Sequence, residues 1–392
     1  MTWLKLTLGL ACLGLGCAGA SAQFPVNRST PVVLTAQQPE QKEKKDDKTA
    51  PPQVDFAVAP AETAEAPRRQ YPQMMGDQGL YSLILVPVPA LAKLQLGDGQ
   101  TIDVPFTATR KVRVPVPGRG GIKIGENENV MPGDRAYFSY NYYNNVQAPA
   151  DGADQFQSFS QTVVIDGRTV QADIFVPGVR PLRGDIHRQT FGLEKSFLDD
   201  RFSLGVRVPL FQQTGDPGFE DADLGDMSFI VKWAPYQEYE SGSGISVGLA
   251  VTAPTGPDIE TPSGDLHTTI VQPFVGYQIN RGRRLVYGFT SIAIPTDERD
   301  LTVWFNDIGF GYRLFEGGLF RSVVPAIEAH VTTPLDHRSV NDEIRGLDLV
   351  VLTGGVHLGV GQRSMLTLGV AAPITGPRPY DVEALVQFNL RF

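Results

Sequence analysis

The last ten residues of the chain, 383–392, alternate almost strictly between polar and apolar side chains. The apolar positions are Ala384, Val386, Phe388, Leu390 and Phe392. A period of two is typical of a β-strand with one polar and one apolar face. About 9 to 11 residues are enough for a tilted strand to cross a bilayer. The segment therefore reads as a membrane-spanning strand, provided that the preceding chain repeats the pattern.

The preceding chain repeats the pattern from about residue 135 onward. Twelve candidate strands can be counted, at 135–147, 184–197, 201–210, 227–235, 244–254, 268–279, 284–295, 302–315, 321–333, 347–360, 364–373 and 382–392. In the fifth of them, Ile245 and Leu249 share one face while Ser246 and Ala250 share the other. No window approaches the 18 apolar residues of a membrane helix. The sequence predicts an all-β fold, a transmembrane antiparallel up-and-down β-barrel of about 12 strands over residues 132–392.

The connections between these segments carry a second signal. If both chain ends are periplasmic, the turns on that side are short, at 198–200, 280–283, 316–318 and 361–363, and most connections on the other side are longer and polar. This asymmetry is expected of outer-membrane barrels. Proline also recurs near the strand ends at spacings of 45, 41, 39 and 39 residues, at Pro209, Pro254, Pro295, Pro334 and Pro373. Proline is tolerated where a strand ladder ends, so the spacing marks hairpin units.

The N-terminal third divides into three parts. Residues 1–22 are predicted to be a signal peptide, because they contain Lys5, an apolar run over 6–18 and the small residues Ala20, Ser21 and Ala22. A signal peptide implies export of the protein. Residues 23–79 are rich in Pro, Gln and charge and predict a disordered periplasmic tether. Residues 80–131 contain short β-like runs broken by proline. They could form a small extension or a plug in the barrel mouth, and both alternatives stay open.

Composition excludes several classes of function. The net charge is −9 and the isoelectric point about 5.2, so no basic stripe is available for nucleic acid. Both cysteines, Cys12 and Cys17, fall inside the expected signal peptide. Loss of that peptide would leave no thiol for disulfides, zinc sites or cysteine catalysis.

One stretch resembles a known family. Its motifs are Leu224-Gly225-Asp226, an alternating run to Lys232-Trp233 and a strand ending in Pro254-Thr255-Gly256. Over about residues 186–392, the chain resembles outer-membrane β-barrels that are associated with the meta-cleavage pathway of phenol degradation. Trp233 departs from the tyrosine expected there. The resemblance implies passage of small, in part aromatic, compounds across the outer membrane. A closing strand that ends on Phe392 also resembles the signal read by the barrel-insertion machinery.

Polar residues on the inner strand faces are the candidate site. A cation facing lipid near the bilayer midplane would cost about 2–4 kcal/mol, so these side chains should line the lumen. The candidates are Arg188, Glu194, Arg207, Lys232, Asp307, Arg313, Glu328, His330, Glu383 and Arg391. Their mixed charges suit a polar passage, and they equally suit a packed network that fills the lumen. Aromatic residues near the strand ends predict an interfacial girdle. These are Tyr140, Tyr142, Trp233, Tyr277, Tyr287, Trp304 and Tyr312.

Motifs for enzyme chemistry, cofactors and metals are missing from the sequence. His330 beside Glu328 is the one arrangement that could belong to a barrel-embedded hydrolase. The acidic loop at 216–226 could attract a divalent cation, although its spacing matches no calcium loop. We therefore expect no enzyme, cofactor or metal site. The expected function is passive passage of small solutes through the bacterial outer membrane, with membrane lipid and a small-molecule solute as partners. The alternative is a structural envelope barrel with a blocked lumen and an arm that binds a periplasmic partner.

Overall fold

The computed structural model describes residues 71–76, 81–95, 101–115, 123–165, 168–258, 265–314, 320–335, 348–375 and 378–392. The expected signal peptide, 1–22, and the tether up to residue 70 lie outside these ranges. The strands are β1 (Tyr81–Gln95), β2 (Thr101–Pro115), β3 (Arg135–Ile165), β4 (Arg168–Phe197), β5 (Phe202–Gly215), β6 (Asp221–Leu224), β7 (Met227–Glu238), β8 (Ser243–Ala253), β9 (Ile270–Arg281), β10 (Arg284–Pro295), β11 (Val303–Tyr312), β12 (Phe320–Pro334), β13 (Leu349–Val360), β14 (Ser364–Pro373) and β15 (Val382–Arg391). None of the described residues forms a helix long and apolar enough to cross a membrane.

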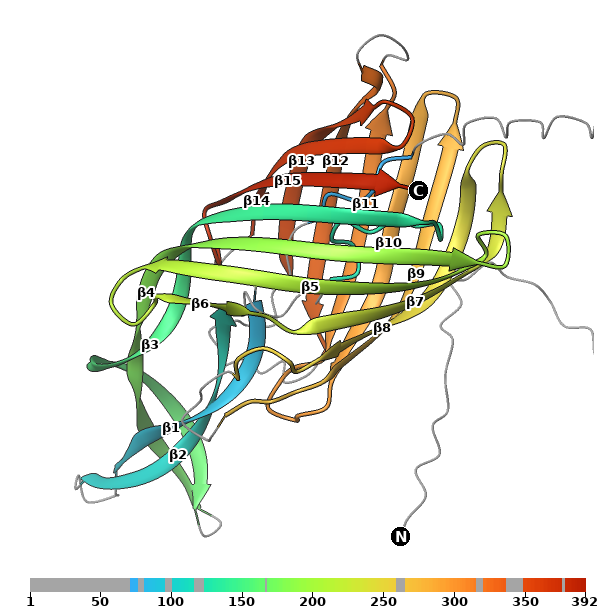
Figure 1. Ribbon diagram of the computed structural model, residues 1–392. Helices are drawn as coiled ribbons and strands as arrows, with labels where there is room; N and C mark the ends of the chain where they lie inside the picture. Colours follow the sequence, from blue (N-terminus) through green and yellow to red (C-terminus); the bar gives the residue numbers. More distant parts are fainter. Residues whose placement is uncertain are drawn as a thin grey trace, which may run out of the picture. The chain divides into compact units, whose positions relative to one another are not determined.

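Twelve of these strands form a closed antiparallel ring. The order is β3, β4, β5, β7, β8 and on through β15, which pairs with β3 again from Val382↔Asn144 to Arg391↔Arg135. Because the first and last barrel strands pair, the wall has no free edge along this seam. Figure 1 shows the strands running side by side around the wall. The predicted fold class is confirmed, and each predicted strand corresponds to a strand of the ring.

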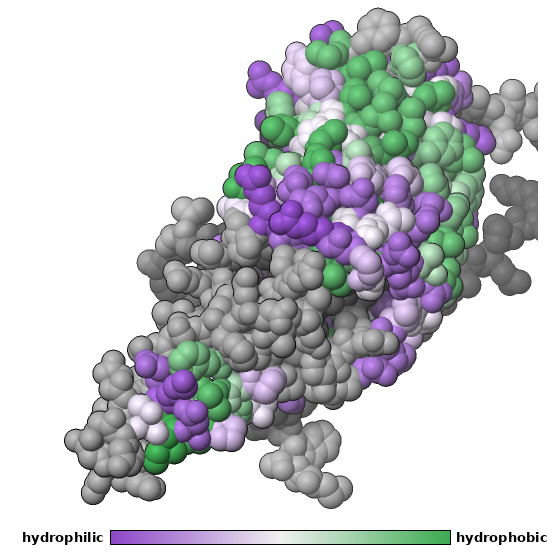
Figure 2. Space-filling view, turned by 90° about the vertical axis from the view of Figure 1, so that its left-hand side faces the viewer, coloured by the Kyte–Doolittle hydropathy of each residue, from purple (hydrophilic) through white to green (hydrophobic). Residues whose placement is uncertain are grey.

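The alternation along each strand sorts side chains between the two faces of the wall. On β8, Ile245 and Leu249 are 44% and 39% exposed, whereas Ser246 and Ala250 are 0% and 2% exposed. Large apolar side chains are exposed in the same way on the other strands, for example Phe229, Ile308 and Phe388. In Figure 2, hydrophobic residues cover much of the upper part of the visible face, above a hydrophilic area. The outer face is thus apolar and the inner face mixed.

The barrel has two distinct ends. The turn end holds the short connections at 198–201, 239–242, 282–283 and 361–363, together with Phe392. The loop end holds the longer connections, including 216–226 and 296–302. Phe392 N donates to Asp134 O at the turn end, so the start of β3 and the end of β15 lie together. The predicted difference between short turns and long loops is present.

Beyond the loop end, β3 and β4 continue past the barrel and pair with each other as far as Ile165↔Arg168. The hairpin of β1 and β2 joins this extension, because Leu91 to Leu94 of β1 pair with Phe175 to Ala172 of β4. Figure 1 shows the four strands projecting away from the end that carries the C-terminus. The sequence indicated strand-like runs here but not the continuation of β3 and β4 past residue 147.

Two further segments lie inside the barrel, and they correct the expected domain boundaries. Residues 72–76 fall within the range expected to be a disordered tether, yet they are buried. Residues 123–131 are buried as well. The range 80–131 therefore holds both an external hairpin, β1–β2, and a segment within the lumen. We call 71–76 and 123–131 together the inner segment.

Candidate functional site

The first part of the inner segment is bound through its backbone to one side of the wall. Met75 N and Gly76 N both donate to the Glu328 carboxylate at 2.9 Å. Gln387 Nε2 donates to Met75 O at 2.7 Å, and Thr353 Oγ1 to Gly76 O at 3.1 Å. These three side chains belong to β12, β15 and β13. Met75 and Gly76 are thus held by wall residues that are more than 250 positions away in the sequence.

The second part presents Glu128 to three cations. The carboxylate lies 2.8 Å from Arg135 Nη2, 2.5 Å from Arg207 Nη2 and 2.5 Å from Lys232 Nζ. The cations come from β3, β5 and β7, and all four side chains are at most 2% exposed. Removing one partner of a buried ion pair typically costs about 3–5 kcal/mol, because the other charge is left uncompensated. Glu128 is therefore a strong anchor for the segment.

Two neighbouring glutamates complete this charged cluster. Glu194 on β4 lies 2.7 Å from Arg135 Nε and 3.0 Å from Lys232 Nζ. Glu126 of the inner segment lies 2.6 Å from Arg188 Nη2, also on β4. The two parts of the segment are joined to each other by Met74 N, which donates to Glu128 O at 3.1 Å. Segment and wall thus form one network of ion pairs and hydrogen bonds.

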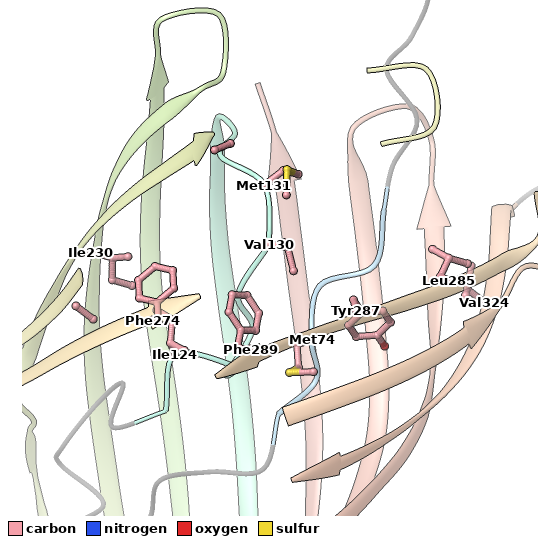
Figure 3. Close-up of a cluster of buried hydrophobic side chains, with 12 residues drawn as sticks. Met74, Ile124, Val130, Met131, Ile230, Phe274, Leu285, Tyr287, Phe289 and Val324 are labelled. Carbon is pink, nitrogen blue, oxygen red and sulfur yellow. The ribbon is translucent and has the colours of Figure 1, made fainter. Parts of the chain in front are cut away.

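Apolar contacts fill the space around this network. Met74, Ile124 and Val130 of the inner segment belong to one buried cluster with Phe274 and Phe289 of the wall. Figure 3 shows these side chains together with Tyr287 among the barrel strands. Because protein interiors tolerate few voids, such a cluster leaves little free space at this level of the lumen.

The inner segment crosses the lumen twice. Tyr71 OH donates to Ser241 O at the turn end, whereas β1 pairs with β4 beyond the loop end. The returning part begins with Lys123, which lies over the Phe305 ring at 5.1 Å, and leads to Arg135 at the turn end. The hairpin β1–β2 therefore lies at the opposite end of the barrel from Tyr71 and from the start of β3.

At the turn end, Asp134 fastens β4 to the start of β3. Its Oδ1 accepts hydrogen bonds from Ser196 N and Oγ at 2.7 Å, and Lys195 Nζ contacts its Oδ2. Burial alone would raise the pKa of the Asp134 carboxyl, but the hydrogen bonds from Lys195 and Ser196 outweigh it and hold the pKa below its usual value. Asp134 thus stays charged at neutral pH and fixes the end of the wall next to the inner segment.

Nine of the ten predicted site residues are buried. They are Arg188, Glu194, Arg207, Lys232, Asp307, Arg313, Glu328, His330 and Glu383. Arg391 is partly exposed at the turn end. Arg188, Arg207, Lys232 and Glu328 are among those that contact the inner segment directly. Whether any of them lines a conducting pathway stays a prediction.

His330 lies between two carboxylates. Its Nδ1 is 2.9 Å from Asp307 Oδ1 and its Nε2 is 3.4 Å from Glu328 Oε2. Glu328 in turn accepts hydrogen bonds from Tyr287 OH at 2.8 Å and from the inner segment. A hydrolase would need one ring nitrogen facing a serine and the other an acid. The geometry around His330 suits a structural cluster of polar side chains.

The expected interfacial girdle of aromatic residues needs correction at one position. Tyr287, expected in the interfacial girdle, is 1% exposed and faces the lumen, whereas Trp233 and Trp304 are 52% and 42% exposed on the outer face. Among the described residues no group of three or more His, Cys, Asp or Glu is arranged to hold a metal. Asp226 of the acidic loop instead accepts hydrogen bonds from Thr255 N and Gly256 N and so closes a loop.

Sequence reasoning missed Glu126, Glu128 and the buried residues Met74 to Gly76. Apart from Arg135, the partners named above lie far away in sequence, and Arg207 is 79 positions from Glu128. A weak local signal exists, because Glu126 and Glu128 stand between the apolar residues Ile124 and Val130 in a chain that then leads into the first barrel strand. Acidic residues in such a setting indicate pairing with buried cations.

Comparisons with known proteins add the following. No protein-family model matches the chain, and no curated protein matches it. Among solved structures, the chain is similar to an outer-membrane channel from Pseudomonas putida F1, with a TM-score of 0.45 and 13% sequence identity over 69% of this chain and 100% of the channel. Similarity at this level carries no inference about family or solute. The association with phenol degradation therefore stays a prediction from sequence motifs.

Proposed function

We propose that this protein is a bacterial outer-membrane channel for small solutes, and that the inner segment closes its lumen. The observation that carries the proposal is that the lumen of a closed barrel is filled by a separate stretch of chain, held by non-covalent contacts. A barrel filled only by wall side chains, as in small barrels, offers no part that can move aside. Displacement of 71–76 and 123–131 would open a passage lined by charged wall residues.

The apolar outer face supports the location. A ring of paired strands leaves no backbone group unsatisfied in lipid, which is the requirement for a β-structure that spans a membrane. The proposed topology places the turn end and the N-terminal tether in the periplasm, as the short turns predict. Insertion would use the barrel-insertion machinery through the strand that ends in Phe392. These assignments rest on the barrel geometry and on the expected signal peptide.

The proposed solutes are small compounds with an apolar or aromatic body. Near the loop end, the inner wall carries a buried apolar cluster of Ile270, Ala293, Val303 and Phe305. Such a surface favours an apolar ligand over water. The sequence resemblance to barrels of an aromatic degradation pathway points in the same direction.

Deletion of residues 71–131 tests the proposal. Tyr71 and Asp134 both lie at the turn end, so the deletion joins two positions on the same side of the barrel. We expect the deleted form to remain folded, seen as a shift in gel mobility on heating, and to give bilayer currents several times larger than the full chain. Folded protein with no current in either form would contradict a channel.

A second candidate function is a structural envelope barrel with a permanently blocked lumen. The observation that favours it is the depth of the Glu128 cluster, whose four charged side chains are at most 2% exposed. In this case, liposomes with the full chain would be as impermeable to small solutes as protein-free liposomes. The hairpin β1–β2 or the N-terminal arm would then serve as the binding surface for a partner.

A further inference from the structure

Four buried cations of the inner wall lie on one group of neighbouring strands. Arg135, Arg188, Arg207 and Lys232 lie on β3, β4, β5 and β7, which are consecutive in the ring. From the wall itself, Glu194 contacts Arg135 and Lys232, and Glu383 on β15 interacts electrostatically with Arg188. Asp307, Glu328 and Glu383 lie on β11, β12 and β15. One sector of the lumen is therefore cationic.

The inner segment supplies the carboxylates that this cationic sector requires. Glu128 contacts three of the cations and Glu126 contacts Arg188. Uncompensated buried charge is costly, so cations that remain shielded from water when the segment is displaced need counter-charges from another source. The two glutamate carboxylates occupy positions that a ligand's carboxylate would take once the segment is displaced.

Arg188 provides an independent indication of a ligand site. Its side chain is fully buried, and its Nε and Nη1 have no hydrogen-bond partner among the described residues. Arg188 has the fork of donors that matches a carboxylate bidentately, but Glu126 lies close to only one of its nitrogens, Nη2. A buried guanidinium with spare donors can accept a better-fitting anion than the present glutamate.

We propose that Arg135, Arg188, Arg207 and Lys232 form a binding site for the carboxylate of a small organic anion, and that Glu126 and Glu128 occupy this site as internal substitutes in the closed state. The inference rests on the proposed channel function and names its solute class, a carboxylate on an apolar body. The apolar cluster of Ile270 and Phe305 near the loop end would receive that body. Glu126 and Glu128 are tethered to the barrel, so their effective concentration at the site is high. A free carboxylate has to compete with them and therefore binds weakly to the unmodified chain.

Calorimetric titration of sodium benzoate into the purified full-length E126Q/E128Q variant tests the site. We expect benzoate to bind at least tenfold more tightly than to the unmodified protein, and more weakly as salt rises, because screening weakens charge attraction. Benzyl alcohol, which has the same ring and no charge, should show no such gain. The variant E220Q removes one acidic charge from an exposed loop and should behave like the unmodified protein.

Equal benzoate affinity in E126Q/E128Q and the unmodified protein would overturn the site, as would an equal gain for benzyl alcohol. If the double variant does not fold, E126Q alone frees only Arg188 and should show a smaller gain for benzoate. No gain in E126Q would then be the overturning result. Because the titration needs no conduction, it separates this inference from the proposed channel, which the current of the 71–131 deletion decides.

Discussion

The position of Arg207 depends on a glycine on the neighbouring strand. A Cβ atom at Gly192 would lie 2.0 Å from the Tyr137 ring, so only glycine lets that ring lie flat over β4. Tyr137 OH accepts a hydrogen bond from Arg207 Nε at 2.9 Å, and the Arg135 guanidinium lies 4.3 Å from the Tyr137 ring centre. Tyr137 thus holds two of the cations that face Glu128.

Gly192→Ala should therefore disturb the charged cluster without changing any charge. Forcing a methyl group into a packed interior typically costs about 1–3 kcal/mol, and we expect a loss of this size in the free energy of unfolding, measured by urea titration in lipid vesicles. Gly354→Ala on β13 is the matched control, since a Cβ there meets nothing within 4 Å. Equal stability of the two variants would show that Tyr137 is not packed as described.

At the scale of elements, the sequence predicted the barrel strands well because each strand has one apolar outer face and one more polar inner face, which gives its sequence a period of two. The strands predicted at 227–235 and 364–373 correspond to β7 (Met227–Glu238) and β14 (Ser364–Pro373). The continuation of β3 past residue 147 was missed because Ala148-Pro149-Ala150-Asp151-Gly152 breaks the alternation and carries turn residues. The inner segment was missed because its burial depends on contacts with residues that are distant in the sequence. Its own sequence shows no hydrophobic period that would indicate this burial.

The assignment of faces can be tested on β8 with two adjacent positions. Leu249 is 39% exposed and Ala250 is 2% exposed. A bimane label on Leu249→Cys should be quenched strongly by brominated lipid, because that side chain faces hydrocarbon. The same label on Ala250→Cys is the control and should be quenched much less. Stronger quenching at position 250 would mean that the strand faces are reversed.

At the scale of the whole molecule, the double crossing of the lumen limits how the barrel can open. The hairpin β1–β2 pairs with β4 beyond the loop end, while both Tyr71 and Asp134 lie at the turn end. The inner segment cannot be withdrawn through the turn end unless the hairpin unpairs and passes through the barrel. We therefore expect opening by sideways rearrangement within the lumen. The sequence left plug and extension as alternatives, and the described parts of the chain between 71 and 131 include both a segment inside the lumen and an external hairpin.

A reversible lock on the inner segment tests the central claim most directly. A Cβ at Gly369 would lie 3.0 Å from the Met75 sulfur, and the chain contains no cysteine beyond Cys12 and Cys17. Met75→Cys combined with Gly369→Cys should form a disulfide that joins the segment to β14. We predict that bilayer current through this double variant is lost on oxidation and returns on reduction, while the current of each single variant does not change between oxidation and reduction. Current that persists with the disulfide formed would contradict passage through a lumen gated by the inner segment.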